Sequence, residues 1–413
     1  MTTIKVLIKN RSLVIIGISE SVSNIGNWIT MMAVLALVLF RGGGGVKESS
    51  LIMLAGLLPT LLFSPVAGWL CDHFDRKKLM IISELISGVL IAGLIFVTRL
   101  EWILVILALE AASLAIMGPA RQSVVPSLVA PEDLTKANAF FQQLSGIIKI
   151  GAPMLAGLVL AVMNPHQAII LDVVSFALSA LILSRLPSLK PHKAIPSDKQ
   201  DKAEESGEGV LPVLKRLPLL RLLFVALFIT IFVIIGFDTL APIYFRDVLS
   251  QTEQFFGLSI GLVGLGTVGV SFMLMSRKTN SDPGKDKISR LMLLATIPTG
   301  LALGTLIHVD WIMSLIVAFV CLIGGIGVGL INIQAGTLLQ TLSPAAVLGR
   351  MSGLFQGTAV MGQLFGILII PLVVPGVLTM GPFFAIGAVV IMVVAVVTMI
   401  NLRGKIQAVE VGA

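Results

Sequence analysis

Residues 68–80 read GWLCDHFDRKKLM, a short charged segment between two long apolar runs. Asp72 lies four residues before Arg76, and Lys77 and Lys78 follow directly. An acid at a helix end interacts favourably with a neighbouring helix dipole, while clustered cations stay in water beside an anionic lipid surface. The segment is therefore typical of a tight turn that joins two membrane helices.

The composition of the 413-residue chain agrees with this interpretation. Hydrophobic residues make up 56% of the chain, charged residues only 12%, and the mean hydropathy is +1.01. A soluble domain carries about a quarter charged residues, and a run of about 20 apolar residues spans a bilayer as a helix. We predict an all-α membrane protein with twelve transmembrane helices, at residues 13–40, 50–71, 79–98, 102–119, 137–163, 166–186, 219–245, 255–276, 288–308, 311–339, 350–376 and 378–402.

The distribution of positive charge predicts the topology. Most of the 29 Lys and Arg residues lie in segments that share one side of the membrane when the N-terminus is cytoplasmic. The positive-inside rule therefore predicts that both termini are cytoplasmic, in a multi-pass protein of a bacterial-type cytoplasmic (inner) membrane. The first apolar run is too long for the core of a signal peptide, so we expect it to remain as the first helix. The net charge of +7 reflects this topology, and no nucleic-acid partner is expected.

Residues 187–218 form the longest polar stretch, rich in Pro, Ser, Lys and Glu. Such residues bury too little apolar area to fold, so we expect a mobile cytoplasmic linker, with a regulatory segment as the alternative. The linker divides the chain into an N-terminal six-helix bundle (1–186) and a C-terminal six-helix bundle (219–413). Two pseudo-symmetric bundles are typical of a secondary transporter.

Three stretches resemble the major facilitator superfamily, and within it the drug/proton antiporters of the macrolide-efflux type. They are residues 68–78, PSLVAPEDLTKAN at 126–138, and LGRM at 348–351. The resemblance implies alternating access between two bundles that rock about a central site. It also implies a cytoplasmic gate, with Asp72 contacting the start of the eleventh helix near Gly349. The residues of this chain that match the family's gate positions are Gly68, Asp72, Arg76, Lys77, Arg121 and Arg350.

The fifth predicted helix contains GIIKIGAPMLAG at 146–157, which is similar to the glycine/proline motif of such antiporters, although Ala152 is inserted within it. Proline removes a helical hydrogen bond and glycine permits close approach, so we expect a bendable helix or, alternatively, an ordinary packing kink. The hinge residues are Gly146, Gly151, Pro153 and Gly157. In many such antiporters the fourth helix carries an arginine within the membrane. Here Glu110 holds that place, so the proton relay of the family does not transfer directly.

Ionisable residues inside the apolar spans need a specific explanation, because each costs at least about 2.5 kcal/mol to insert at the bilayer centre. Glu84 lies about 9 Å beyond Lys78 along its helix, and Asp172 lies near the end of the sixth helix. We expect both to reach the interface and to be structural. Four others lie deeper, and the resemblance places them on helices that line the central cavity: Glu20, Glu110, Lys149 and Asp238.

Polar residues also recur at helical spacing, which places them on one helix face. Exposing such a polar helix face to lipid is too costly, so we expect these residues to line a water-filled cavity. The predicted coupling or substrate-binding residues are Glu20, Asn24, Asn27, Glu110, Gln142, Lys149, Asp238, Gln356 and Gln363. Glu110 and Lys149 are alternatively a structural ion pair. Glu20 and Asp238 have no evident partner in the sequence, and burial favours their neutral forms, so they are the preferred proton carriers.

These features predict proton-coupled export of an amphipathic or lipophilic compound, with Na⁺ as an alternative coupling ion. Two alternatives are a dedicated exporter of one siderophore, peptide or lipid, and a non-transporting membrane sensor. The sequence contains no P-loop, no HExxH motif and no His cluster, so we expect no enzyme activity, no cofactor and no metal. The expected partners are the small lipophilic substrate, the coupling ion and the lipid bilayer, with the protein acting as a monomer.

Overall fold

The computed structural model describes residues 10–130, 133–187, 214, 216, 218–276, 310–342 and 348–410. Every regular element within these ranges is helical. The chain forms two compact units, Met1–Lys193 with Gln251–Gly261, and Ala194–Ser250 with Leu262–Ala413.

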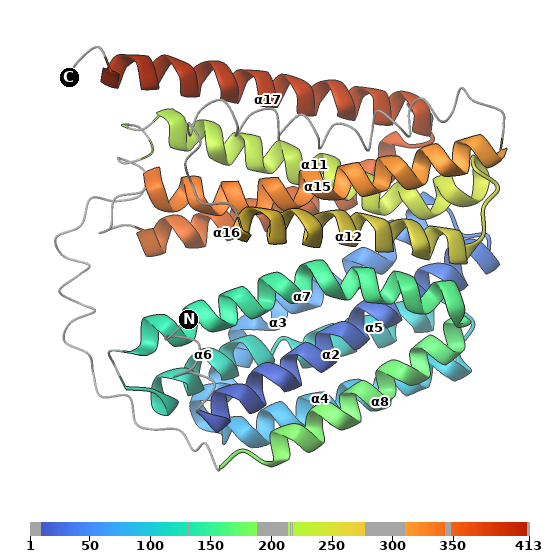
Figure 1. Cartoon of the computed structure of the whole chain (residues 1–413). Coiled ribbons are helices and arrows are strands. Elements are labelled where there is room, and N and C mark those ends of the chain that lie inside the picture. Colours follow the sequence, from blue (N-terminus) through green and yellow to red (C-terminus); the bar gives the residue numbers. More distant parts are fainter. Residues whose placement is uncertain are drawn as a thin grey trace. The chain divides into compact units, whose positions relative to one another are not determined.

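The helices of the first unit come almost entirely from the N-terminal half of the chain (Figure 1). They are α2 (Arg11–Leu35) with the π-helical turn η1 (Ala36–Arg41), α3 (Val46–His73), α4 (Arg76–Gly93) with the 3-10 turn η2 (Leu94–Phe96), α5 (Leu100–Leu114), α6 (Met117–Leu128), α7 (Leu134–Val162) and α8 (Pro165–Ser184).

The remaining described helices are α11 (Pro218–Asp247), α12 (Glu253–Ser276), α15 (Asp310–Leu342), α16 (Leu348–Val373) and α17 (Met380–Glu410). The first residues of α12 belong to the first unit and the other residues to the second. In the second unit α11 packs against α16 and α17. Close helix approach there relies on glycine, because a Cβ on Gly366 would lie 2.8 Å from the Ile235 side chain.

The predicted spans correspond to the described helices, with two differences. The fourth span, predicted to end at residue 119, continues through a short break after α5 and then through α6 to Leu128. The ninth span, 288–308, lies outside the described residues, as does most of the predicted linker. Ten of the described helical stretches are long and apolar enough to cross a membrane, and the count of twelve stays a prediction.

The charged turn at residues 68–80 connects α3 to α4 through only Phe74 and Asp75. Asp75 caps α4, since its Oδ1 accepts a hydrogen bond from the backbone N–H of Lys77 at 2.9 Å. The Lys77 ammonium donates to the backbone carbonyl of Leu186 just beyond α8. The tight turn is therefore confirmed, but the capping acid is Asp75, while Asp72 is exposed in the last turn of α3.

Asparagine residues fix the beginnings of α2 and α8. Asn10 Oδ1 accepts from the backbone N–H groups of Ser12 and Leu13, and its Nδ2 donates to the Leu128 carbonyl at 2.7 Å. This contact ties the start of α2 to the end of α6. Asn164 and Gln167 form reciprocal side-chain to backbone hydrogen bonds of 3.0 and 3.2 Å at the start of α8.

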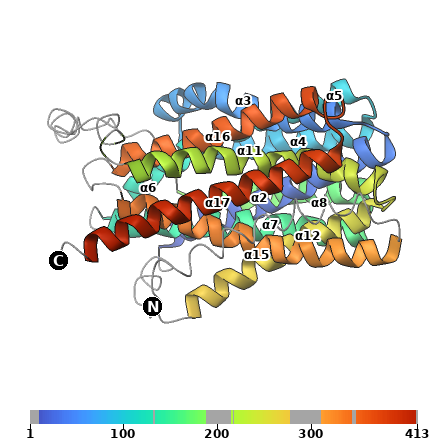
Figure 2. The same ribbon diagram turned by 90° about the horizontal axis from the view of Figure 1, so that it is seen from above.

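Helix α8 packs against α2 and α4, as Figure 1 shows, and Figure 2 gives the same fold from above. The surfaces that meet carry small residues, which allow the backbones to approach. Ser19 of α2 and Ser179 of α8 are fully buried, and their hydroxyl oxygens lie 2.6 Å apart. We refer to the contacts of α8 with α2 and α4, which include Ser19, Ser23, Glu84 and Ser179, as the serine seam.

Candidate functional site

The most distinctive charged contact in the first unit joins Glu20 of α2 to Arg121 of α6. Arg121 Nε lies 3.1 Å from Glu20 Oε1, and the two side chains are only 22% and 13% exposed. The guanidinium also lies over the ring of Phe141, at 5.0 Å from its centroid. The sequence showed no evident partner for Glu20, and the structure identifies Arg121 as that partner. The fourth span continues past the break after α5 into α6, which carries Arg121 next to Glu20.

A hydrophobic core lies beside this ion pair, towards the end of the unit where α2 begins and α6 ends. Glu20 is about 14 Å along α2 from its first residue. The core consists of Leu13, Ile16, Cys71, Met80, Met117, Ala120, Val124, Val125, Ala137, Phe141, Leu183 and Leu186. The ion pair is therefore partly screened from water, which strengthens its attraction and increases the penalty for removing one partner.

A cavity of about 200 Å³ lies between α2, α3 and α5. Its polar lining includes Asn27, Thr30, Thr60 and Glu110, and the remaining wall is mainly apolar. Asn27 Oδ1 is buried and accepts no hydrogen bond from the residues that the structure describes. We call this the Glu110 pocket. Its unused acceptors suit a ligand that donates hydrogen bonds, while its volume is below the roughly 300 Å³ of typical drug pockets.

The predicted polar stripe on α2 is divided between different environments. Glu20 is paired and Asn27 lines the Glu110 pocket, whereas Asn24 is exposed. The Asn24 side chain donates to the backbone carbonyl of Glu20 at 2.8 Å. The Asn24 amide therefore has its hydrogen bond within α2. Glu20 contributes to the ion pair with Arg121, and Asn27 contributes to the Glu110 pocket.

Glu84 and Asp172 do not reach an interface, contrary to expectation, because both side chains are 0% exposed. Glu84 lies in the serine seam near Ser23 and Ser179, and within the described part of the chain neither of its carboxylate oxygens has a hydrogen bond of good geometry. Asp172 accepts hydrogen bonds from Thr30 at 2.5 Å and from Ser175 at 2.9 Å. The position of each acid along its own helix did not predict this burial, because side chains of α2 and α8 surround both acids.

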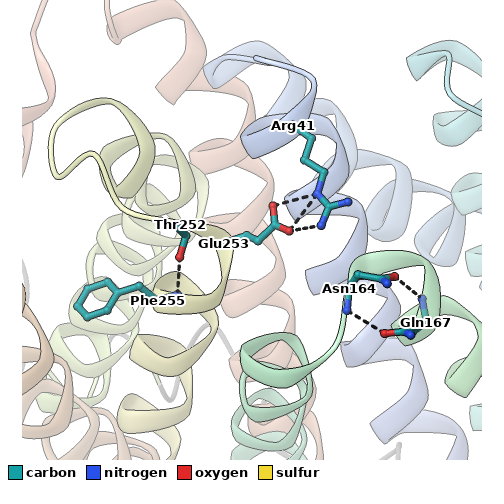
Figure 3. A network of polar contacts seen from close by, with 6 residues as sticks. All are labelled: Arg41, Asn164, Gln167, Thr252, Glu253 and Phe255. Carbon is teal, nitrogen blue, oxygen red and sulfur yellow. Dashed lines mark hydrogen bonds and ion pairs between the residues drawn. The ribbon is translucent and has the colours of Figure 1, made fainter.

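A second ion pair joins Arg41, at the end of η1, to Glu253, at the start of α12 (Figure 3). Arg41 Nε lies 3.0 Å from one carboxylate oxygen and 3.2 Å from the other. Phe40 and Phe256 pack beside it with ring centroids 5.6 Å apart. No sequence pattern indicates this pair, because its members lie 212 residues apart at the ends of separate apolar runs.

The predicted hinge residues of α7 differ in their surroundings. A Cβ on Gly157 would lie 2.1 Å from the backbone oxygen of Gly257 on α12, so this glycine is a close helix–helix contact. A Cβ on Gly146 or Gly151 would meet nothing within 4 Å. Pro153 lies within the helix, which continues through it. Gly157 is therefore explained by packing, and a hinge role for the others stays a prediction.

The predicted gate residues in the first unit cluster at the turn between α3 and α4, except for Arg121. Gly68 is partly buried with open space around it, and Asp72 is exposed. Arg76 begins α4 beside the capping Asp75. In the described part of the chain the ion pair of Arg121 is with Glu20, which removes Arg121 from the turn itself.

The remaining predicted residues lie in the second unit or outside the described side chains. Asp238 of α11 and Gln363 of α16 are partly buried, while Arg350 and Gln356 of α16 are exposed. Gln142 and Lys149 of α7 fall among the residues whose side chains are not described, so the suggested Glu110–Lys149 pair stays a prediction. Within the described residues, no three His, Cys, Asp or Glu side chains form a metal-binding group.

Comparison with known families matches residues 16–367 to the Major Facilitator Superfamily. The chain belongs to this superfamily. It is therefore a member of a family of multi-pass membrane transporters, which are not enzymes, and the expected resemblance is confirmed.

Relatives with efflux functions in their names support the same assignment. The chain is 30% identical to macrolide efflux protein A of Streptococcus pyogenes over 266 residues, 60% of this chain and 65% of the relative. It is 24% identical to the multidrug efflux pump Tap of Mycobacterium bovis, over 83% of this chain and 82% of the pump. It is also 27% identical to the uncharacterized MFS-type transporter YfiS of Bacillus subtilis, over 84% and 83% of the two chains.

Solved transporter structures share the fold. A crystal structure of the peptide transporter POT matches with a TM-score of 0.70 and 16% identity, covering 95% of this chain and 94% of that one. A bacterial homologue of the iron transporter ferroportin, in an inward-facing state, matches with a TM-score of 0.65 and 18% identity, covering 95% and 98%. At these identities the likeness concerns architecture alone.

Proposed function

We propose that this protein exports amphipathic or lipophilic compounds, including macrolide-like ones, across the cytoplasmic membrane in exchange for protons. The observation that carries the proposal is a partly buried Glu20–Arg121 ion pair in the same unit as the polar-lined Glu110 pocket. The efflux functions in the names of two relatives agree with this direction of transport.

In this proposal the Glu110 pocket binds the polar end of the substrate. Glu110 accepts hydrogen bonds or balances a protonated amine, and Asn27 supplies a further acceptor that has no hydrogen-bond partner among the described residues. Met31, Leu107 and Leu114 provide an adaptable apolar wall. Because the pocket is too small for a whole drug, the rest of the substrate extends beyond it.

Glu20 carries the exchanged proton, and Arg121 sets when it does so. While the ion pair is intact, the Arg121 guanidinium favours the ionised form of Glu20 over the neutral form. A conformational change that separates α2 from α6 would leave Glu20 in a low-dielectric site, where the neutral form is favoured. Proton uptake is in this way tied to the position of a helix. Asp238 of α11 is a second candidate carrier, and Na⁺ is the alternative ion.

Transport then proceeds by alternating access of the bundles 1–186 and 219–413, joined by the cytoplasmic linker 187–218, with both termini cytoplasmic and one chain acting alone. The Arg41–Glu253 pair lies within the first compact unit. The turn between α3 and α4 lies on the cytoplasmic side, together with the gate residues Asp72 and Arg76.

Efflux from proteoliposomes tests this proposal. Purified protein is reconstituted, and uptake of a radiolabelled macrolide and of an amphipathic cationic dye is followed with an imposed pH gradient or Na⁺ gradient, one at a time. A proton antiporter moves substrate towards the acidic compartment, because protons leave that compartment in exchange. Movement driven only by the Na⁺ gradient would replace the proton by Na⁺. No gradient-driven movement of any compound in a broad panel would favour a non-transporting sensor.

Charge-neutralised variants separate coupling from folding. Glu20→Gln alone leaves the partly buried Arg121 without its partner, so it is compared with the double variant Glu20→Gln/Arg121→Gln, which buries no unpaired charge. We expect the double variant to fold and to exchange substrate across the membrane without a gradient, but to lose pH-driven accumulation. Glu101→Gln, at an exposed site in the first turn of α5, is the matched control. Native accumulation by the double variant would contradict the role of Glu20.

A competition panel distinguishes broad efflux from a dedicated exporter. Unlabelled macrolides, cationic dyes, siderophores, short peptides and lipids are each added in excess to the labelled substrate. Inhibition by several chemically unrelated compounds supports broad efflux, whereas inhibition by one class alone identifies a dedicated transporter.

A further inference from the structure

Asp172 is fully buried in a site that is built around its carboxylate. It accepts hydrogen bonds from the hydroxyls of Thr30, at 2.5 Å to Oδ2, and of Ser175, at 2.9 Å to Oδ1. Gly26 makes room for it, since a Cβ there would lie 2.0 Å from Asp172 Oδ1. Asp172 takes no part in the coupling proposed for Glu20, although an ionisable group inside a membrane bundle is costly.

No positive charge balances Asp172 among the described side chains. From the neighbouring helices the ionisable groups are Glu20 of α2 and Glu84 of α4, and the charge of Asp172 also acts on Glu110 of α5. Glu20 is already paired with Arg121. The lysines of α7, at 136 and 149, have side chains outside the described set. Burial and nearby acids both favour the neutral, protonated form of a carboxylic acid.

Thr30 connects Asp172 to the Glu110 pocket. The pocket lining includes Thr30, and the Thr30 hydroxyl donates to Asp172. A hydroxyl both donates and accepts hydrogen bonds. When Asp172 is protonated, the acid must donate, and Thr30 can rotate to accept that bond while it donates towards the pocket. Ser175 lies on α8 itself and is absent from the pocket lining, so it offers no such route.

We propose that Asp172 is a second proton-binding site, separate from the Glu20–Arg121 pair, and that it exchanges its proton with the Glu110 pocket through the hydroxyl of Thr30. The site lies where α8 packs against α2 and α4, so its ionisation changes the electrostatic energy of the serine seam. Ligand in the pocket and proton on Asp172 are thereby linked through one threonine.

Infrared difference spectroscopy of the purified protein tests this directly and needs no substrate or membrane gradient. Protonated carboxylic acids absorb separately from carboxylates, so a change of buffer pH reports each acid that changes its proton. We expect Asp172→Asn to lose one carboxylic acid band that the native protein shows. After a pH jump, Thr30→Val should gain and lose that band more slowly by a factor of about ten or more, because the relay hydroxyl is missing.

Ser175→Ala is the matched control, since it removes the other hydrogen bond to Asp172 and leaves the route through Thr30. In Ser175→Ala the carboxylic acid band of Asp172 should shift in frequency, but the acid should gain and lose its proton at the native rate. If Asp172→Asn does not fold, Asp172→Glu keeps the acid and should move the band. A native pH-difference spectrum for a folded Asp172→Asn protein overturns the proposal. So does native exchange speed in Thr30→Val. Failure of the transport assay would leave this measurement unaffected.

Discussion

Arg41 and Glu253 form an ion pair whose two sides differ in burial. The Arg41 side chain is 44% exposed, whereas that of Glu253 is 9% exposed. The pair unites the end of η1 with the start of α12, and the tilted rings of Phe40 and Phe256 pack beside it. Because only the acid is desolvated, losing the arginine is not equivalent to losing the glutamate.

We therefore expect Arg41→Gln to lower the melting temperature more than Glu253→Gln does. Arg41→Gln leaves a buried carboxylate uncompensated, at a cost of roughly 1–3 kcal/mol, whereas Glu253→Gln leaves an arginine that water can solvate. The double variant should recover part of the loss. Thermal unfolding of the purified variants in one detergent measures the order. Equal losses for the two single variants would show that the pair is held mainly by its aromatic neighbours.

A Cβ on Gly157 of α7 would lie 2.1 Å from the Gly257 carbonyl oxygen of α12, whereas a Cβ on Gly151, six residues earlier, would meet no described atom within 4 Å. We expect Gly157→Ala to force the two helices apart and to lower both the melting temperature and the transport rate. Gly151→Ala should be as stable as the native protein or more so, because alanine favours a helix by up to about 1 kcal/mol over glycine. A stable Gly151→Ala that transports slowly would support its predicted role as a hinge.

The two aspartates at the turn between α3 and α4 have different expected roles. Asp75 caps α4, so Asp75→Ala should cost about 1 kcal/mol of stability. Asp72 is exposed, and Asp72→Asn should leave the melting temperature unchanged while it slows transport, if the family resemblance places it correctly in the gate. Thermal unfolding and proteoliposome efflux of both variants separate the two roles. Equal loss of stability in Asp72→Asn would instead indicate a structural contact.

The helices were predictable from sequence because each is a long apolar run, and the turn at 68–80 because its charges interrupt two of them. The partners of the buried charges were not. The fourth helix was predicted to end near Pro119, yet proline is tolerated in the first turn of a helix, so α6 continues and places Arg121 beside Glu20. The position of Asp172 near the end of its helix suggested that it was accessible. The sequence alone does not reveal that Gly26 allows α2 to approach closely enough to cover it.

Gly26 gives the most direct test of how closely α2 and α8 pack. A Cβ at this position would lie 2.0 Å from Asp172 Oδ1 and 2.1 Å from Ser175 Oγ, both on short side chains with little freedom to move. Gly26→Ala should therefore lower the melting temperature, even though the change by itself favours a helix. Gly118→Ala on α6, where a Cβ meets nothing within 4 Å, is the matched control and should be neutral. Adding Asp172→Ala to Gly26→Ala removes one of the two clashes and should restore part of the stability. If Gly26→Ala is as stable as Gly118→Ala, α2 and α8 do not approach closely enough to enclose the Asp172 carboxylate.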